Sequence, residues 1–269
     1  KAMKQKSDNI FRKFNSLFTG IAILLGIVIL GSCSKSDNDS IIRDGVNIQV
    51  WEALSQNPHE VQLKIETCEM YNCLNFGINY ELKKTSSNKF KVELTSVQIE
   101  EICEAGSGPA RTVISLGNLN PGDYTIAFIV NDNDYDLKLN ISDSRIKLDF
   151  ANEPEGNDIH LALNELQRIP AQTLWGSVSV SQSANIPLFE DFFMSLNEMD
   201  VNDFTGVDGN YGYFIKSNNL ITNVDQTGAI ETRSFLKSFS GNPEQIINLE
   251  TIFKDSMSVN WYYYDGEVL

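Results

Sequence analysis

Apolar and polar residues alternate through much of the first half of the chain, between residues 61 and 150. Val61, Leu63 and Ile65 show the pattern first, each separated from the next by one polar residue. A period of two residues is typical of strands that bury one face, and turn-forming residues separate the segments. Many short strands of this kind predict a mainly β fold, with an antiparallel sandwich over residues 44–165. The alternation continues in residues 74–82, 90–94, 124–130, 135–141 and 146–150.

A short motif within this region makes the expected fold more specific. Leu119, Pro121, Gly122 and Tyr124 resemble the corner of immunoglobulin-like and fibronectin-like domains. In that corner the tyrosine hydroxyl forms a hydrogen bond to the backbone a few residues upstream. The resemblance implies an immunoglobulin-like sandwich. It does not imply the inter-sheet disulfide of antibody domains, because Ile126 stands where they carry a cysteine.

The pattern changes to a helical period in the second half of the chain. Residues 188–199 repeat apolar side chains at intervals of three and four, which is the spacing of one helix face. Asn185 is placed to cap this helix, and Pro187 suits its first turn. A second helix is expected after Asn242 as cap, with Gln245 completing a capping box. The side chains that share a face are Leu188, Phe189, Phe192, Leu196 and Met199 in the first helix, and Ile246, Leu249, Glu250 and Phe253 in the second.

Strand patterns surround these two helices, in residues 174–180, 211–217, 219–224, 229–239 and 259–265. The resulting order is strand, helix, strand pair, helix and strand. This order predicts a smaller α+β domain over residues 166–269, and it resembles the ferredoxin-like arrangement.

The amino-terminal segment has the layout of a secretory signal. Basic residues precede an apolar run, residues 17–30, and small residues follow it. A membrane-spanning anchor is the alternative, but such a helix needs about 20 apolar residues, and this run is shorter and contains glycine. Leu30, Gly31, Ser32 and Cys33 resemble the lipobox of bacterial lipoproteins, in which an aliphatic residue and two small residues precede a cysteine.

The lipobox resemblance implies how the chain is processed and where it resides. A diacylglycerol is attached to the thiol of Cys33, the leader of residues 1–32 is removed, and the new amino terminus is acylated. Residues 33–43 then form an acidic tether. Its first part also resembles the acidic signal of surface-exposed lipoproteins of the Bacteroidota type, although a plain solvated linker is the alternative. We therefore expect an outer-membrane lipoprotein of the cell envelope, exposed at the surface if the tether acts as such a signal.

The charge of the chain limits its partners. It contains 36 acidic and 21 basic residues, which gives a net charge of -15. Such a surface repels nucleic acid and anionic lipid headgroups. We therefore expect no nucleic-acid role, and we expect membrane contact through the acylated Cys33 alone. The excess charge itself favours solubility.

Three further cysteines, Cys68, Cys73 and Cys103, follow the predicted lipidation site. Disulfides form outside the cytoplasm, and three cysteines allow one bridge and one free thiol. The sequence leaves the pairing open. A zinc site would need a fourth ligand at suitable spacing, and neither His59 nor His160 lies in such a motif. We therefore expect one disulfide, with reduced structural cysteines as the alternative, and no metal or other cofactor.

Catalytic motifs are hard to place in this sequence, since it has only two histidines. His160 is expected to be a half-buried structural residue, and His59 is expected to be exposed. The sequence contains no nucleophile elbow, phosphate loop or zincin helix. We therefore predict that the protein is not an enzyme. A hydrolase that uses paired carboxylates is the catalytic alternative.

The remaining expectation is a non-catalytic binding or adhesion module, with a glycan or another envelope protein as its partner. Four consecutive aromatic residues, Trp261, Tyr262, Tyr263 and Tyr264, are the candidate ligand-stacking side chains. On a strand, Trp261 and Tyr263 face one way and Tyr262 and Tyr264 the other. One pair should pack on the helices, and the other could stack on a ligand. The alternative is that both faces of the strand are covered by the rest of the fold. A structural or assembly component of the envelope is the alternative.

The lipobox predicts the effect of one substitution. Cys33→Ser should leave an uncleaved precursor without lipid, because the thiol is the atom that accepts the diacylglycerol. Metabolic labelling with a palmitate analogue measures this directly, and equal labelling of the variant and the parent chain would contradict the prediction.

Overall fold

The structure is a computed structural model, and its described part is mainly β, as the sequence predicts. The described residues belong to one compact unit. The leader of residues 1–32, Cys33 and most of the tether of residues 33–43 lie outside the described residues. The structure describes residues 41–265 except 56–57, 155, 157, 219 and 223–228.

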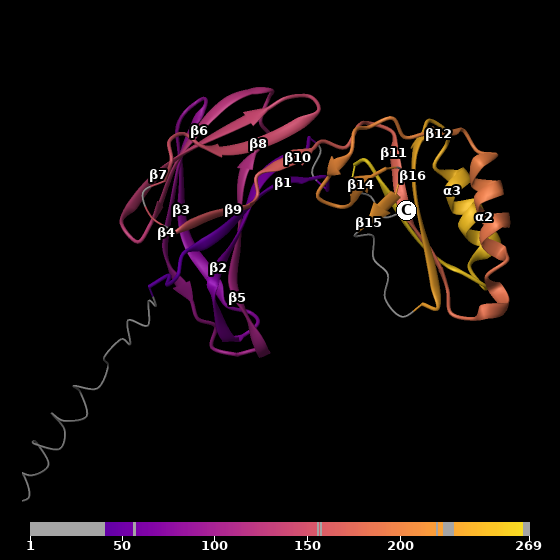
Figure 1. The fold of residues 1–269 in the computed structure, drawn as a ribbon, viewed down its shortest axis with the longest axis horizontal. Coiled ribbons are helices and arrows are strands. Elements are labelled where there is room, and N and C mark those ends of the chain that lie inside the picture. Colours follow the sequence, from indigo (N-terminus) through magenta and orange to yellow (C-terminus); the bar gives the residue numbers. More distant parts are fainter. Residues whose placement is uncertain are drawn as a thin grey trace, which may run out of the picture. The chain divides into compact units, whose positions relative to one another are not determined.

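Ten strands hydrogen-bond into one large sheet (Figure 1). They are β1 (Val46–Ala53), β2 (Glu60–Cys73), β3 (Gly77–Ser86), β4 (Lys89–Gln98), β5 (Ala105–Gly117), β6 (Gly122–Val130), β7 (Asn133–Ile141), β8 (Arg145–Phe150), β9 (Ile159–Leu163) and β10 (Glu165–Gln167). Their order is β10-β8-β7-β6-β4-β3-β5-β2-β1-β9. Most neighbours are antiparallel, whereas β9 lies parallel to β1, β6 lies parallel to β4, and β3 lies parallel to β5.

The large sheet curls around a single core. β1 contacts both β8 and β10, which belong to the other end of the strand order, so the sheet is nearly barrel-like. The predicted alternation is confirmed in β2, where Val61, Leu63 and Ile65 are buried. The sequence predicted two facing sheets, whereas hydrogen bonding continues through all ten strands. The weakest link is between β3 and β5, which share one residue pair, Gly77 with Arg111.

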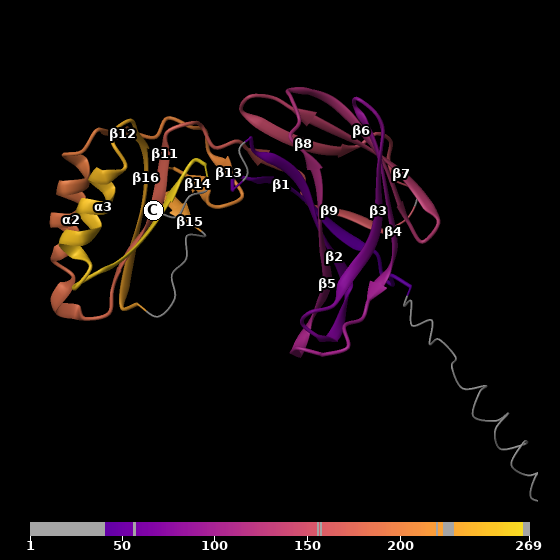
Figure 2. The same ribbon diagram turned by 180° about the vertical axis from the view of Figure 1, so that it is seen from behind.

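The second half of the chain forms a smaller sheet with two helices. Its elements are β11 (Thr173–Val180), the 3-10 helix η1 (Ser183–Asn185), α2 (Leu188–Asn197), β12 (Val201–Asp203), β13 (Gly209–Asn210), β14 (Ile215–Ser217), β15 (Leu220–Thr222), β16 (Glu231–Phe239), α3 (Glu244–Phe253) and β17 (Ser258–Tyr263). Four strands pair antiparallel in the order β12-β16-β11-β17, and β13, β14 and β15 form a separate three-stranded sheet. In Figure 2, α2 and α3 lie side by side against the four-stranded sheet.

Two apolar clusters cover the two faces of the four-stranded sheet. The helices contribute Phe192 and Leu249 to one of them, together with Trp261 of β17. The other cluster contains Trp175 and Phe214, together with Leu54 from the turn after β1. Because Leu54 precedes the predicted domain boundary, contacts cross that boundary in the described residues.

The first predicted helix is present, but its predicted cap was wrong. α2 starts at Leu188 and its N-cap residue is Pro187, which forms no side-chain cap hydrogen bond. Asn185 belongs instead to η1, and its side-chain amide donates to the Ser256 carbonyl at 2.8 Å. The short 3-10 turn moves the start of α2 beyond the reach of this side chain.

The second predicted cap is only partly present. Asn242 accepts a hydrogen bond from the backbone N–H of Glu244 at 3.0 Å, which satisfies one free donor at the start of α3. The capping box with Gln245 does not form, because the buried Oε1 atom of Gln245 has no hydrogen-bond partner among the described residues.

The corner motif in the large sheet has the geometry that its resemblance implied. The Tyr124 hydroxyl donates to the Asn120 carbonyl at 2.8 Å, across the turn that leads into β6. This hydrogen bond is exposed to solvent. Water can therefore replace the hydroxyl if it is removed.

Removing the Tyr124 hydroxyl should have a small effect on stability. Because the carbonyl can be rehydrated, Tyr124→Phe should lower the free energy of unfolding by about 0.5 kcal/mol. The matched control is Tyr80→Phe, since the Tyr80 hydroxyl has no hydrogen bond within the described part of the chain. Urea denaturation measures both, and equal midpoints for the two variants would show that the corner hydrogen bond contributes nothing.

Candidate functional site

The four consecutive aromatic residues lie where the strand pattern predicted, on opposite faces of β17 and the residue after it. Trp261 and Tyr263 pack with the helices, whereas Tyr262 and Tyr264 pack with the cluster around Trp175. Trp261 is 1% exposed, and Tyr262 stacks on Trp175 with 5.8 Å between ring centroids. Both faces of the strand therefore pack against apolar clusters, with Trp261 buried and the three tyrosines half-buried.

The cysteines form one bridge. Cys73, at the end of β2, is joined to Cys103, just before β5, and Cys68 is free and half-buried. Burial raises the pKa of the Cys68 thiol, and the nearby carboxylates of Asp44 and Glu66 raise it further. Among the described residues, no group of three or more histidine, cysteine, aspartate or glutamate side chains is arranged to hold a metal ion.

The two histidines have the opposite exposures to those predicted. His160 on β9 is exposed, because its position in the alternation faces away from the core. The His59 side chain is only 18% exposed, and its Nδ1 lies 3.7 Å from a carboxylate oxygen of Glu52. The turn after β1 holds it against the end of the strand, which the sequence pattern did not indicate.

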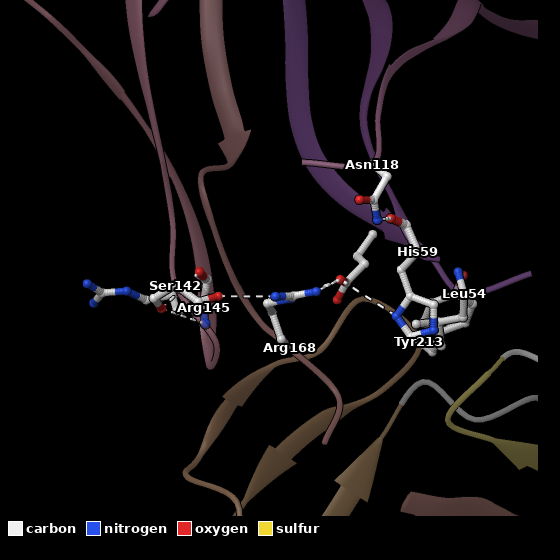
Figure 3. A network of polar contacts seen from close by, with 8 residues as sticks. Leu54, His59, Asn118, Ser142, Arg145, Arg168 and Tyr213 are labelled. Atoms are coloured by element: carbon white, nitrogen blue, oxygen red, sulfur yellow. Dashed lines mark hydrogen bonds and ion pairs between the residues drawn. The ribbon is translucent and has the colours of Figure 1, made fainter. Parts of the chain in front are cut away.

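Glu52 is the centre of a polar network at the end of β1. Its carboxylate is 4% exposed and accepts hydrogen bonds from Arg168 Nη2 at 2.6 Å and Nε at 2.9 Å. Figure 3 shows Arg168 between this carboxylate and Ser142, whose carbonyl accepts from Nη1 at 3.3 Å. His59 lies on the other side of the carboxylate, and its own carbonyl accepts from the Asn118 amide at 2.9 Å.

The environment of Glu52 keeps it ionised. Burial by itself raises the pKa of this carboxyl, but the hydrogen bonds from His59 and Arg168 and the positive charge of Arg168 outweigh it, so the pKa lies below its ordinary value. A carboxylate with a depressed pKa that is held by an arginine is a poor proton carrier near neutral pH. We therefore assign Glu52 a structural role, as the anchor point of Arg168.

The same turn also connects to the second half of the chain. The backbone N–H of Leu54 donates to the Tyr213 hydroxyl at 3.2 Å (Figure 3). The Tyr213 ring lies 5.1 Å from that of Trp51, between ring centroids. The sequence carried one signal for this network, since Glu52 occupies a core-facing position in the alternation of β1 and a buried acid needs a partner.

A groove along the edge of β16 is a candidate for binding. Its volume is about 650 Å³. β12 pairs with β16 only through the last three residues of that strand, Lys237 to Phe239. Residues 232–236 line the groove, and in the part of the chain that the structure describes no strand pairs with them on this side.

Apolar side chains line the groove on both sides of the strand edge. Phe193 of α2 and Phe235 of β16 contribute from the helix side of the sheet. Phe204, Ile221 and Leu236 contribute from the other side, where they pack with the cluster around Trp175. An extended chain lying here could therefore place successive side chains against apolar surface on alternate sides.

The groove also carries three cations in a chain with an excess of acids. Lys216 pairs with Asp208, and Lys237 Nζ lies 3.0 Å from Asp203. In both pairs the cation is the less exposed partner, with side chains 10% and 20% exposed, against 50% and 95% for the two aspartates. Arg233 pairs with Glu190 and Glu231 nearby. The basic groups thus lie in the wall, and the acids lie towards solvent.

Comparison with family models, curated proteins and solved structures gives no match for this chain. Within the described residues, no helix has both the length and the apolar character that crossing a membrane requires.

The Glu52 network predicts a large effect at Arg168. Arg168→Gln should lower the free energy of unfolding by about 2–3 kcal/mol, because it leaves a buried carboxylate without its main cation. The control is Arg145→Gln, whose exposed pair with Glu165 is long at 3.7 Å and should contribute less than about 0.5 kcal/mol. Urea denaturation of residues 34–269 compares them, and similar losses for both would contradict the assignment.

The same network predicts a pH dependence. A carboxyl with a lower pKa in the folded state stabilises the fold above its unfolded pKa, near the ordinary 4.5, and this contribution disappears as the pH falls through the folded pKa. Stability should therefore fall as the pH drops below about 4.5. Glu52→Gln should flatten this part of the profile, and an unchanged slope would rule out Glu52 as its source.

Proposed function

We propose that the protein is a lipid-anchored component of the cell envelope whose folded part is a non-catalytic binding module for an extended segment of another protein. The observation that carries the proposal is the groove beside the unpaired stretch of β16. A strand edge presents backbone N–H and C=O groups that an added strand can pair with. The apolar walls supply the surface that gives such pairing its free energy.

The groove favours a peptide over a glycan. Glycan binding would need exposed aromatic faces, whereas Trp261 is buried and the tyrosines of residues 262–264 are half-buried against the apolar clusters. The free edge of β16 fits an extended main chain, which can bond at every second residue. Lys216, Arg233 and Lys237 line the groove and would favour carboxylate side chains on a bound segment, which could take the place of their present acidic partners.

Membrane attachment is proposed from the sequence. Cys33, in its lipobox-like context, is the residue that would carry the lipid, and the first described strand begins soon afterwards, at Val46. A short acidic tether would hold the folded part near the outer membrane. We propose further that the protein is exposed at the cell surface, with the tether as the signal for this exposure. Several acyl chains provide stable anchoring where one chain does not.

We also propose a relationship to known folds for each half of the chain. The order β12-β16-β11-β17, all antiparallel and with a helix after β11 and after β16, supports a ferredoxin-like α+β domain. The hydrogen bond of Tyr124 in its corner supports an immunoglobulin-like relationship for the large sheet. The parallel pairing of β4 with β6 is a departure from the antiparallel sheets of that fold.

Blocking the groove should abolish peptide binding. We would select ten-residue peptides from a random display library against the protein and expect sequences with alternating apolar residues. Thr232→Arg should weaken their binding at least about tenfold, because the added side chain fills the groove beside β16. Thr125→Arg on β6 is the matched control, since it adds the same side chain to a half-buried strand position outside the groove. Failure to enrich any peptide, or equal binding by the two variants, would overturn the proposal.

A further inference from the structure

The large sheet has a second open edge, along β3. β3 pairs with β4 on one side through most of its length, but it meets β5 only at Gly77. Beyond Ile78 every residue of β3 is exposed. Among the described residues, no strand pairs with this edge between Ile78 and Ser86. Its outward N–H and C=O groups are therefore available to another chain.

Side chains on β3 divide between the two faces of the strand. Tyr80 and Leu82 lie on the same face as the buried Ile78, and they are 39% and 37% exposed. Their cross-strand neighbours on β4, Leu94 and Val92, are buried. The core thus ends at a rim of two half-exposed apolar side chains that a further strand would cover.

The opposite face of β3 carries charges of both signs, with Glu81 and Lys83 two residues apart. Lysines on an edge strand normally oppose pairing with another edge. That effect depends on what the incoming strand places opposite them. A lysine opposite a glutamate stabilises an antiparallel pair, whereas a like charge destabilises it.

Self-pairing of β3 is complementary in one register. When two copies pair antiparallel about a two-fold axis at Leu82, each Glu81 faces Lys83 of the second copy. Leu82 then faces Leu82 of the second copy, and Tyr80 faces the long side chain of Lys84. Shifting the axis by one residue places Glu81 opposite Glu81, or Lys83 opposite Lys83, and both arrangements are repulsive.

We infer that β3 is a self-association edge, at which a second copy of this chain adds its own β3 antiparallel in the register centred on Leu82. The charge complementarity of the strand with itself selects a second copy over an unrelated peptide. Pairing through a single strand lies at the small end of protein interfaces, so the dimer should be reversible. This inference is independent of the groove at β16.

A single cysteine tests the register in the full chain. Residues that face each other across an antiparallel pair have Cα atoms about 4.5–5.5 Å apart, which is within disulfide reach. Leu82→Cys should therefore give a disulfide-linked dimer in membranes under mild oxidation. Thr85→Cys should not, because the two copies of residue 85 would lie about 20 Å apart in this register. The parent chain controls for the free thiol of Cys68.

Charge reversal then tests the complementarity, in the Leu82→Cys chain. Lys83→Glu should lower the cross-linked fraction several-fold, and so should Glu81→Lys, because each places like charges opposite each other. The double exchange Glu81→Lys with Lys83→Glu should restore it, and mixing the two single variants should give cross-linked heterodimers. Lys138→Glu, an exposed lysine on β7, is the control for the change in net charge.

The cross-linking results distinguish a β3 dimer in this register from other arrangements. Cross-linking at residue 82 but not at 85, with loss and recovery on charge exchange, supports the β3 dimer. Absence of a dimer at residue 82, equal cross-linking at both positions, or indifference to Lys83→Glu would overturn it. Thermal melting of each variant confirms that a lost dimer reflects the edge and not a lost fold, since residues 81, 83 and 85 are exposed.

Discussion

The ion pair of Glu52 and Arg168 joins parts of the large sheet that are far apart in the chain. Glu52 lies next to the last residue of β1, and Arg168 directly follows β10, which lies at the other end of the strand order. The pair therefore spans the place where the curled sheet approaches itself. A carboxylate that is 4% exposed cannot remain charged without its cation, so the position of Arg168 is fixed once β1 is in place. Arg168 in turn bonds to the Ser142 carbonyl, which ties the β7–β8 turn into the same closure.

The large sheet nearly closes at the Glu52–Arg168 pair, but two strand edges elsewhere in the chain remain open. β3 separates from β5 after Gly77, and β16 extends beyond the end of β12, so each presents backbone groups without a strand partner among the described residues. Water satisfies such groups, but the two edges also lie beside apolar side chains that remain partly exposed or line a groove. The combination of free backbone groups and neighbouring apolar surface is what strand addition requires. The fold thus offers two separate strand edges to partners.

The sequence predicted those features that depend on local periodicity. Alternation located β2, β3, β4 and β6–β8 of the large sheet but did not locate β1 or β5. The buried faces of β2 and α2 are the predicted ones, as Leu63 and Phe192 illustrate. Features that depend on chain closure were missed. Asn185 was expected to cap α2 because of its spacing, but η1 intervened. Glu52 and Arg168 are far apart in sequence, and no local pattern pairs them. The groove at β16 was missed for a related reason, since the length of β12 decides how much of that edge is free.

Electrostatics determines how partners can reach the two edges. With a net charge of -15, two copies of the chain repel each other at long range, and so does any acidic partner. Physiological salt screens this repulsion beyond about 8 Å but weakens contacts between adjacent charges much less. Local charge can then decide which surfaces pair. Lys83 and Lys84 lie on the β3 edge, and Lys216 and Lys237 line the groove. Both edges therefore carry basic side chains, although acidic residues outnumber basic ones in the chain. A protein built this way resists indiscriminate association while two short strand edges remain open to partners that match their charge.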